Sequence, residues 1–327
     1  MKYERERQVA LRAVTQAAEL CIAVQNETAQ IRSVEKGDRS PVTVADFGSQ
    51  ALICRALNEA FPDDCIVAEE DSRTLREPQG SGLLDQVVRY VQLAHPMATS
   101  DDVCQWIDRG DRRVANRFWA LDPIDGTKGF LRREQYAIAL ALIVNGAVEV
   151  AILGCPALPM SLDDTTNSVG VVFVAQRGRG ALTAHLGQDE YHPIHVTGPD
   201  DHSHLRLVQS VESSHGDASL QQTVARQVGI SEPPLTLDSQ AKYGTVARGD
   251  AALYLRFPSP GHPNYREKIW DHAAGALIVE EAGGRVTDMH GVPLNLSSDY
   301  QMKVNRGVIV SNGLLHAGVL AACRQQA

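Results

Sequence analysis

The sequence predicts an α/β protein in two parts, an N-terminal half built on an antiparallel sheet with helices and a C-terminal half of mixed α/β character. Two apolar runs, 136–144 and 147–155, flank Asn145-Gly146, which predicts a β-hairpin because both central residues of a type I′ turn need positive φ. In the C-terminal part, strand-like and helical patterns alternate, as is typical of a layered α/β domain. We therefore expect two domains, 1–200 and 201–327, joined by a segment rich in His, Asp, Gly and Pro.

The N-terminal half begins with an amphipathic helix, since apolar residues recur at three- and four-residue steps from Val9 to Val24. A polar, basic loop at 35–41 and a short β-branched segment at 42–44 follow. A second helix is expected to start near Asp46 and to end before Pro62, because the residue before a proline is pushed out of the helical region. The other elements expected in this half are a buried strand at 65–68, a helix around 84–91 and a strand at 117–121.

The C-terminal half shows the alternation that predicts its layered structure. The helical pattern at 273–282 ends at Gly283-Gly284, a usual C-cap because glycine readily adopts positive φ. The expected strands are 205–211, 235–237, 251–257 and 308–310, and the expected helices are 218–228, 240–247, 273–282 and a last one after residue 310.

The composition is that of a folded protein without a general affinity for polyanions. Of 327 residues, 43% are apolar and 22% charged, which excludes wholesale disorder. The 31 Lys and Arg against 40 Asp and Glu give a net charge of −9, which argues against nucleic-acid and anionic-membrane partners. The six cysteines are scattered without a C-x-x-C pair, and the charged N-terminus lacks the apolar core of a signal peptide. We expect a cytoplasmic protein, whether monomer or homodimer.

Acidic residues fall at the ends of several predicted elements. For Asp46 or Asp271 taken alone, a helix cap or a surface charge is the simpler interpretation. The run DPIDGT at 122–127 is more specific, because Pro123 holds Asp122 extended and lets two carboxylates and a carbonyl converge at a turn. Such hard oxygen donors suit Mg²⁺ rather than Zn²⁺. The backbone N–H groups that follow, at Gly126 and Thr127, suit a phosphate group.

Three motifs in the same order resemble the inositol monophosphatase superfamily. They are DPIDGT at 122–127, WDHAAG at 270–275 and EAGG at 281–284, and the resemblance covers nearly the whole chain. It implies an αβαβα layered sandwich and a lithium-sensitive phosphomonoesterase that uses two or three Mg²⁺ ions per site.

Finer features are similar to one branch, the 3′(2′),5′-bisphosphate nucleotidases of the fungal and plant type. This resemblance implies removal of the 3′-phosphate of adenosine 3′,5′-bisphosphate to give AMP, as in sulfur metabolism. The segments that carry it are SPVTVAD at 40–46, VAEED at 67–71, DGTKGF at 125–130, LDSQAKY at 237–243 and YREKIWD at 265–271.

The resemblance also assigns roles to individual residues. The pair that orients and deprotonates the attacking water is Asp46 and Thr127. The implied Mg²⁺ ligands are Glu69, Asp122, the carbonyl of Ile124, Asp125 and Asp271. The implied substrate contacts are Gly126 and Thr127 near the scissile phosphate, and His215, Ser239, Lys242 and Arg256 on the nucleotide.

Most metal ligands thus fall in 1–200 and most nucleotide contacts in 201–327. An inositol polyphosphate 1-phosphatase or an inositol monophosphatase-like activity is the alternative on the same scaffold. A non-catalytic nucleotide or metal sensor is more remote, because every implied metal carboxylate is present. The choice among adenosine bisphosphate, its sulfated form and inositol phosphates stays open at this point.

Overall fold

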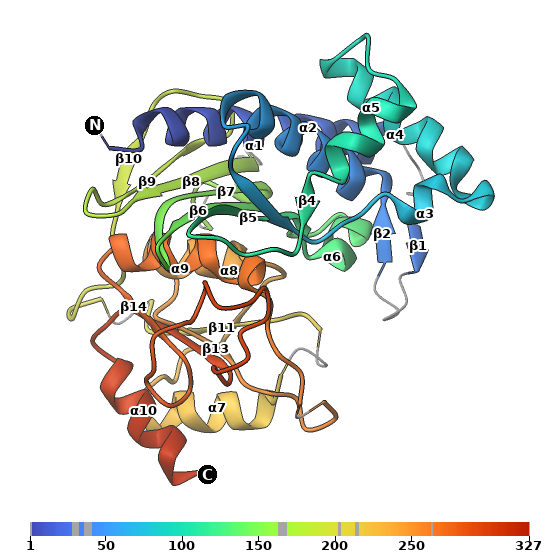
Figure 1. Ribbon diagram of the computed structural model, residues 1–327. Helices are drawn as coiled ribbons and strands as arrows, with labels where there is room; N and C mark the ends of the chain where they lie inside the picture. The colour runs from blue at the N-terminus through green and yellow to red at the C-terminus, as the bar shows by residue number, and fades with distance from the viewer. Residues whose placement is uncertain are drawn as a thin grey trace.

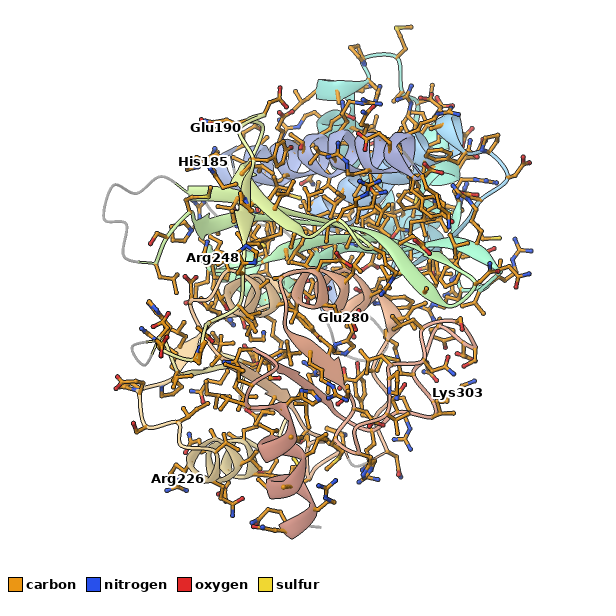
Figure 2. All side chains as sticks on the ribbon, turned by 90° about the vertical axis from the view of Figure 1, so that its left-hand side faces the viewer. His185, Glu190, Arg226, Arg248, Glu280 and Lys303 are labelled. Carbon is orange, nitrogen blue, oxygen red and sulfur yellow. The ribbon has the colours of Figure 1, made fainter. Side chains whose placement is uncertain are left out.

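Helices and sheets alternate in five stacked layers in the computed structural model, which describes residues 2–27, 33–35, 41–162, 169–201, 204–212, 216–262 and 264–326 (Figure 1). Figure 2, turned by 90°, shows the same order, with Glu280 in the central helical layer and Arg226 in an outer one. This order confirms the predicted α/β fold. The outer helices are α1 (Glu4–Glu27) and α2 (Val44–Ala60) on one side and α7 (Ala218–Gln227) and α10 (His316–Gln325) on the other, and the central ones are α8 (Ala241–Ala247) and α9 (Ala273–Glu281).

The larger sheet has eight strands in the order β10-β9-β8-β7-β6-β5-β3-β4. It is antiparallel from β5 to β10, as predicted, but β3 pairs in parallel with both β5 and β4. The difference arises because a crossover through α4 (Ser81–Ala94) and α5 (Ser100–Ile107) leads from β3 to β5, and parallel neighbours need such a connection. The strands are β3 (Cys65–Ala68), β4 (Gly110–Asp111), β5 (Arg117–Asp125), β6 (Ala137–Val144), β7 (Ala147–Pro159), β8 (Val169–Gln176), β9 (Ala181–His185) and β10 (His192–Ile194).

The hairpin at the centre of this sheet confirms the Asn-Gly signal. Asn145 and Gly146 have φ angles of 50° and 81°, the positive values that a type I′ turn requires, and β6 and β7 pair antiparallel on either side of them. The sequence patterns missed β8, β9, β10 and α5. The strands β9 and β10 are short and β8 is almost continuously apolar, so their periodicity carries little information. Helix α5 differs, because Thr99 and Asp102 form a capping box and Val103, Cys104 and Ile107 form a buried face.

The smaller sheet combines parallel and antiparallel strands, and helices alternate with its strands as expected for the C-terminal half. Its order is β12-β11-β13-β15-β14, with β11 parallel to both neighbours and β15 antiparallel to both of its own. Its strands are β11 (Leu207–Gln209), β12 (Leu235–Thr236), β13 (Leu253–Arg256), β14 (Arg285–Thr287) and β15 (Val308–Ser311). The remaining short elements are β1 (Ser33–Glu35), β2 (Pro41–Thr43), α3 (Arg73–Arg76), α6 (Thr127–Arg132) and the 3₁₀ turns Pro78–Gly80 and Ile269–Asp271.

The central helices are buried all round because a sheet covers each of their two faces. From Ala273 to Val279 every residue of α9 is buried, and one apolar cluster joins α8, α9 and both sheets. Close packing of α8 against α9 depends on Gly275, since a Cβ there would lie 2.3 Å from the Cγ of Tyr243. In the described part of the chain, no helix combines the length and the apolar character that a membrane span requires.

Candidate active site

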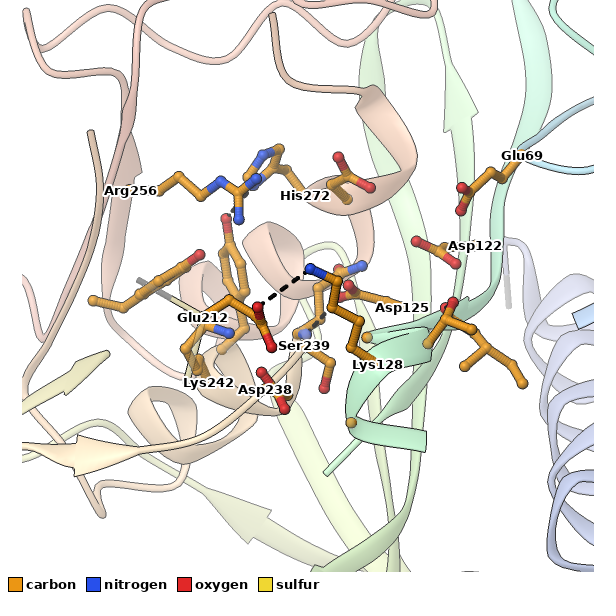
Figure 3. Close-up of a pocket in the computed structure, with 18 of the residues that line it drawn as sticks. Glu69, Asp122, Asp125, Lys128, Glu212, Asp238, Ser239, Lys242, Arg256 and His272 are labelled. Carbon is orange, nitrogen blue, oxygen red and sulfur yellow. Dashed lines mark hydrogen bonds and ion pairs between the residues drawn. The ribbon is translucent and has the colours of Figure 1, made fainter. Parts of the chain in front are cut away.

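A cavity of about 210 Å³ opens between the two sheets, where β3 and β5 end and α6, α8 and β13 approach (Figure 3). The structure brings nearly all the predicted site residues to it. Those that line it are Glu69, Asp122, Ile124, Asp125, Gly126, Thr127, Ser239, Lys242, Arg256 and Asp271. His215 lies outside the described residues.

The register of two parallel strands places the first carboxylates side by side. Ala68 of β3 pairs with Leu121 of β5, so Glu69 and Asp122 follow at the same edge of the sheet. The pairing of β5 with β6 then shifts between Asp122 and Asp125. The intervening Pro123 has no N–H for the ladder, and such irregularities redirect the side chains around them.

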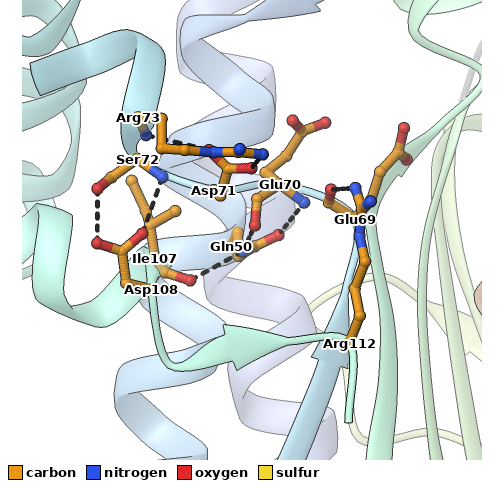
Figure 4. A network of polar contacts seen from close by, with 9 residues as sticks. All are labelled: Gln50, Glu69, Glu70, Asp71, Ser72, Arg73, Ile107, Asp108 and Arg112. Carbon is orange, nitrogen blue, oxygen red and sulfur yellow. Dashed lines mark hydrogen bonds and ion pairs between the residues drawn. The ribbon is translucent and has the colours of Figure 1, made fainter. Parts of the chain in front are cut away.

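Glu69 belongs to a segment that α2 and α5 hold in place (Figure 4). The side-chain amide of Gln50 accepts from the backbone N of Glu70 at 3.0 Å and donates to its carbonyl at 2.7 Å. The same Gln50 amide donates to the Ile107 carbonyl at 3.0 Å. Farther along, the carboxylate of Asp108 accepts from the backbone N and the hydroxyl of Ser72. The backbone within the acidic run and just after it is therefore held by protein contacts alone.

Asp46 and Thr127 form the pair that the resemblance implied. Asp46 is 1% exposed, and its Oδ2 accepts from the N and Oγ1 of Thr43 at 2.8 and 2.5 Å in the capping box of α2. That leaves Oδ1 to accept from Thr127 Oγ1 at 3.1 Å. Thr127 Oγ1 also lies 3.2 Å from the Ile124 carbonyl. Helix α2 begins at Val44, slightly before the predicted start, because Thr43 rather than Asp46 is its N-cap.

Burial and neighbouring carboxylates disfavour the charged form of the acidic side chains around Asp125 and Asp271. Burial raises the pKa of Asp271 well above its ordinary value, and the carboxylates of Asp125 and Glu267 raise it further. Burial also raises the pKa of Asp125, although Lys242 and the backbone N of Gln240 oppose that change. Buried carboxylates of this kind are stabilised by a cation, and their oxygens are the donors that Mg²⁺ prefers. The donor set therefore fits a hard divalent ion.

A second potential ligand group overlaps this set. Among the described residues, ligand atoms of Glu267, Asp271 and His272 lie within 4.8 Å of one another. Glu267 and His272 already have partners, because Arg256 Nε lies 3.0 Å from Glu267 Oε1 and the Tyr243 hydroxyl lies 2.7 Å from His272 Nδ1. Burial opposes the charge of Glu267, but Arg256 and His272 outweigh it and lower its pKa to about 2. We therefore regard Glu267 as the counter-ion of Arg256.

The other end of the cavity holds the cations Lys242 and Arg256, with the carboxylates of Glu212 and Asp238 nearby (Figure 3). Lys242 is 3% exposed, its Nζ donates to the Leu237 carbonyl at 3.3 Å, and it lies 5.3 Å from the ring centroid of Tyr254. Burial lowers the pKa of Lys242 to about 8, although Asp125 partly offsets this effect. Arg256, at the end of β13, faces the same space (Figure 3). The cavity therefore has a carboxylate end and a cationic end.

Sequence reasoning missed several residues of this cavity. Gln240 donates its backbone N to Asp125 and its side-chain amide to the Trp270 carbonyl, so it ties α8 to the turn that carries Asp271. Lys128 and Glu212 face each other across the opening. Only contacts between distant segments reveal these roles, although Gln240 and Lys128 both lie inside motifs that carry the resemblance.

Comparison with known proteins gives a family. The model of the inositol monophosphatase family matches residues 2–327, so the chain belongs to that family. A Schizosaccharomyces pombe relative named 3′(2′),5′-bisphosphate nucleotidase is 39% identical over 329 residues, covering 95% of this chain and 92% of the relative. A relative of the same name from Oryza sativa is 40% identical over 338 residues, covering 98% of this chain and 94% of the relative.

Solved structures agree on the fold. The suhB extragenic suppressor protein of Bartonella henselae superimposes with a TM-score of 0.66 at 18% identity, covering 98% of both chains. CysQ from Bacteroides thetaiotaomicron, a bacterial member of the inositol monophosphatase family, gives a TM-score of 0.62 at 21% identity, covering 95% of this chain and 98% of its own. The predicted layered architecture is thereby confirmed.

Proposed function

We propose that this chain is a Mg²⁺-dependent phosphomonoesterase that removes the 3′-phosphate of adenosine 3′,5′-bisphosphate and releases AMP. The observation that carries the proposal is the cavity with a carboxylate end and a cationic end. One end suits metal-assisted attack on a phosphate, and the other suits a second phosphate on the same substrate. The names of relatives that match nearly the whole chain support this choice of substrate.

The metal would be held by oxygen donors at the carboxylate end. These donors are Glu69, Asp122, the Ile124 carbonyl, Asp125 and Asp271, which together suit two or three Mg²⁺ ions. Bound Mg²⁺ lowers the pKa of a coordinated water and stabilises charge on the transferring phosphoryl group.

The proposed base is the pair of Asp46 and Thr127. Thr43 engages Asp46 Oδ2 through both its backbone and its hydroxyl, so Oδ1 is the oxygen directed at Thr127. Thr127 Oγ1 accepts a proton from the attacking water and passes its own proton to Asp46 Oδ1. This relay needs no movement of Asp46, because the capping box fixes the carboxylate.

The substrate would span the cavity. Gly126 and Thr127 stand next to the metal ligands and would contact the scissile phosphate, and Gly126 has a φ of 86° that favours glycine. Ser239, Lys242 and Arg256 at the cationic end would contact the nucleotide and its second phosphate. His215 is proposed as a further nucleotide contact on the resemblance alone.

Phosphate release from a substrate panel tests the proposal. Adenosine 3′,5′-bisphosphate, its sulfated form, an inositol bisphosphate and an inositol monophosphate are each offered with Mg²⁺ and then with EDTA. We expect kcat/KM to be highest on the nucleotides and to vanish in EDTA. Faster turnover of the inositol phosphates would assign the chain to the alternative activity, and no turnover of any substrate would favour a sensor.

A further inference from the structure

An ion pair crosses the opening of the cavity. Lys128 Nζ lies 3.2 Å from Glu212 Oε2, and both residues line the cavity (Figure 3). Lys128 follows Thr127 in α6, whereas Glu212 follows β11 in the C-terminal half. In Figure 3 the ammonium group of Lys128 points away from Glu69 and Asp122, toward the side of the cavity that holds Lys242 and Arg256.

The two partners are held very differently. The second carboxylate oxygen of Glu212 lies 2.7 Å from Arg132 Nη1, and Arg132 also pairs with Asp238 and Glu134. Glu212 is therefore anchored in a network, and its side chain is 22% exposed. Among the described residues, Glu212 is the only ion-pair partner of Lys128, whose side chain is 47% exposed. Lys128 is therefore the less constrained side chain of the pair.

We propose that Lys128 binds the second, non-transferred phosphate of the substrate. In the absence of substrate, Glu212 pairs with the ammonium group of Lys128, and the phosphate replaces Glu212 in this pair when substrate binds. The inference rests on the proposed function, since it assumes a substrate with two phosphates. A phosphate dianion carries more charge than the single carboxylate that it replaces, so the exchange favours a bisphosphorylated ligand. A monophosphate bound at the metal end offers Lys128 no replacement partner.

The proposal predicts that substitutions of Glu212 and of Lys128 change KM in opposite directions. Glu212→Gln keeps a hydrogen-bond acceptor for Arg132 but no longer holds Lys128, so KM for adenosine 3′,5′-bisphosphate should fall about two- to fivefold, the scale of an exposed ion pair. Lys128→Met should raise the same KM about ten- to thirtyfold, the lower part of the range for a charge-assisted hydrogen bond. Lys128→Arg should restore most of the affinity. In all three variants kcat should stay close to its original value.

The double variant shows whether Glu212 acts by holding Lys128 or by its own negative charge. In the Lys128→Met background, Glu212→Gln should leave KM unchanged, because the group that it releases is absent. Glu134→Gln is the matched control, since it removes another carboxylate partner of Arg132 that does not line the cavity. Its KM should equal that of the original protein. Melting temperatures of all variants show whether the fold is kept.

Several outcomes would overturn the exchange. A rise or no change in KM for Glu212→Gln would mean that the ion pair only joins the two halves. An equal fall in KM with and without Lys128 would mean that Glu212 acts through its own charge. Turnover of adenosine 3′,5′-bisphosphate by the original protein tests the proposed function separately. That turnover does not depend on whether KM rises or falls in the variants.

Discussion

Replacing Lys242 by methionine is expected to stabilise the free protein while it weakens substrate binding. Lys242 is 3% exposed, and burial lowers its pKa from 10.5 to about 8. That difference corresponds to a cost on the order of 3 kcal/mol for keeping the ammonium group charged in the folded chain at pH 7. Methionine has a similar length and no charge, but it loses the hydrogen bond to the Leu237 carbonyl, worth about 1 kcal/mol. The net gain in the free energy of unfolding is therefore about 2 kcal/mol.

The pH dependence of the free energy of unfolding provides a second test of the stabilisation by Lys242→Met. Below pH 8, Lys242 is charged in both the folded and the unfolded chain, so the original protein bears the full cost. Between pH 8 and 10.5 the folded chain loses the proton first, so the stability of the original protein rises relative to that of the variant. The advantage of Lys242→Met should thus shrink by at least half from pH 7 to pH 10.

Denaturant unfolding in EDTA at both pH values measures this advantage. The exposed Lys303, paired with Asp299, serves as the control, since Lys303→Met should leave the stability nearly unchanged at both pH values. The same Lys242→Met variant should lose about 1.5–3 kcal/mol in kcat/KM on adenosine 3′,5′-bisphosphate, and far less on adenosine 3′-monophosphate. A variant that is no more stable at pH 7, or an advantage that is equal at pH 10, refutes the reasoning.

Three further predictions concern the remaining parts of the site. EDTA should abolish phosphate release, Mg²⁺ should restore it, and Li⁺ should inhibit it in a titration against Mg²⁺. Asp46→Asn should lower kcat about 10²–10⁴-fold with little change in KM, which steady-state kinetics measure; an unchanged kcat would exclude Asp46 as the base. Arg256→Ala should cost about 1.5–3 kcal/mol in kcat/KM on the bisphosphate only, and equal losses on both nucleotides would argue for a structural role.

The carboxylate end of the site could be predicted from sequence because its signals are local. Asp122 and Asp125 lie in the last four residues of a buried strand, and Pro123 between them marks the place where regular pairing is interrupted. The turn at Asn145-Gly146 was equally local, since its geometry depends on the two residues themselves. In each case a few consecutive residues determine the backbone, so the tertiary structure adds little to the prediction.

Features that depend on distant contacts could not be predicted. Glu281 ends α9, where the helix dipole disfavours a carboxylate. The structure explains its position, because the carboxylate accepts from the backbone N of Gly178, Arg179 and Gly180 in the turn between β8 and β9. The pairing of Lys128 with Glu212 likewise joins segments 84 residues apart. The division of the chain at residue 200 stays a prediction.

Gln240 connects the two ends of the cavity. Gln240 donates its backbone N to Asp125 at the carboxylate end and directly precedes α8, which carries Lys242 at the cationic end. Its side chain donates to the Trp270 carbonyl and accepts from the N of Gly275, so the turn with Asp271 is tied to the same point. A substrate with two phosphates must match this fixed separation. Under the proposed function, the chain would therefore select its substrate by the distance between two charges as much as by the charges themselves.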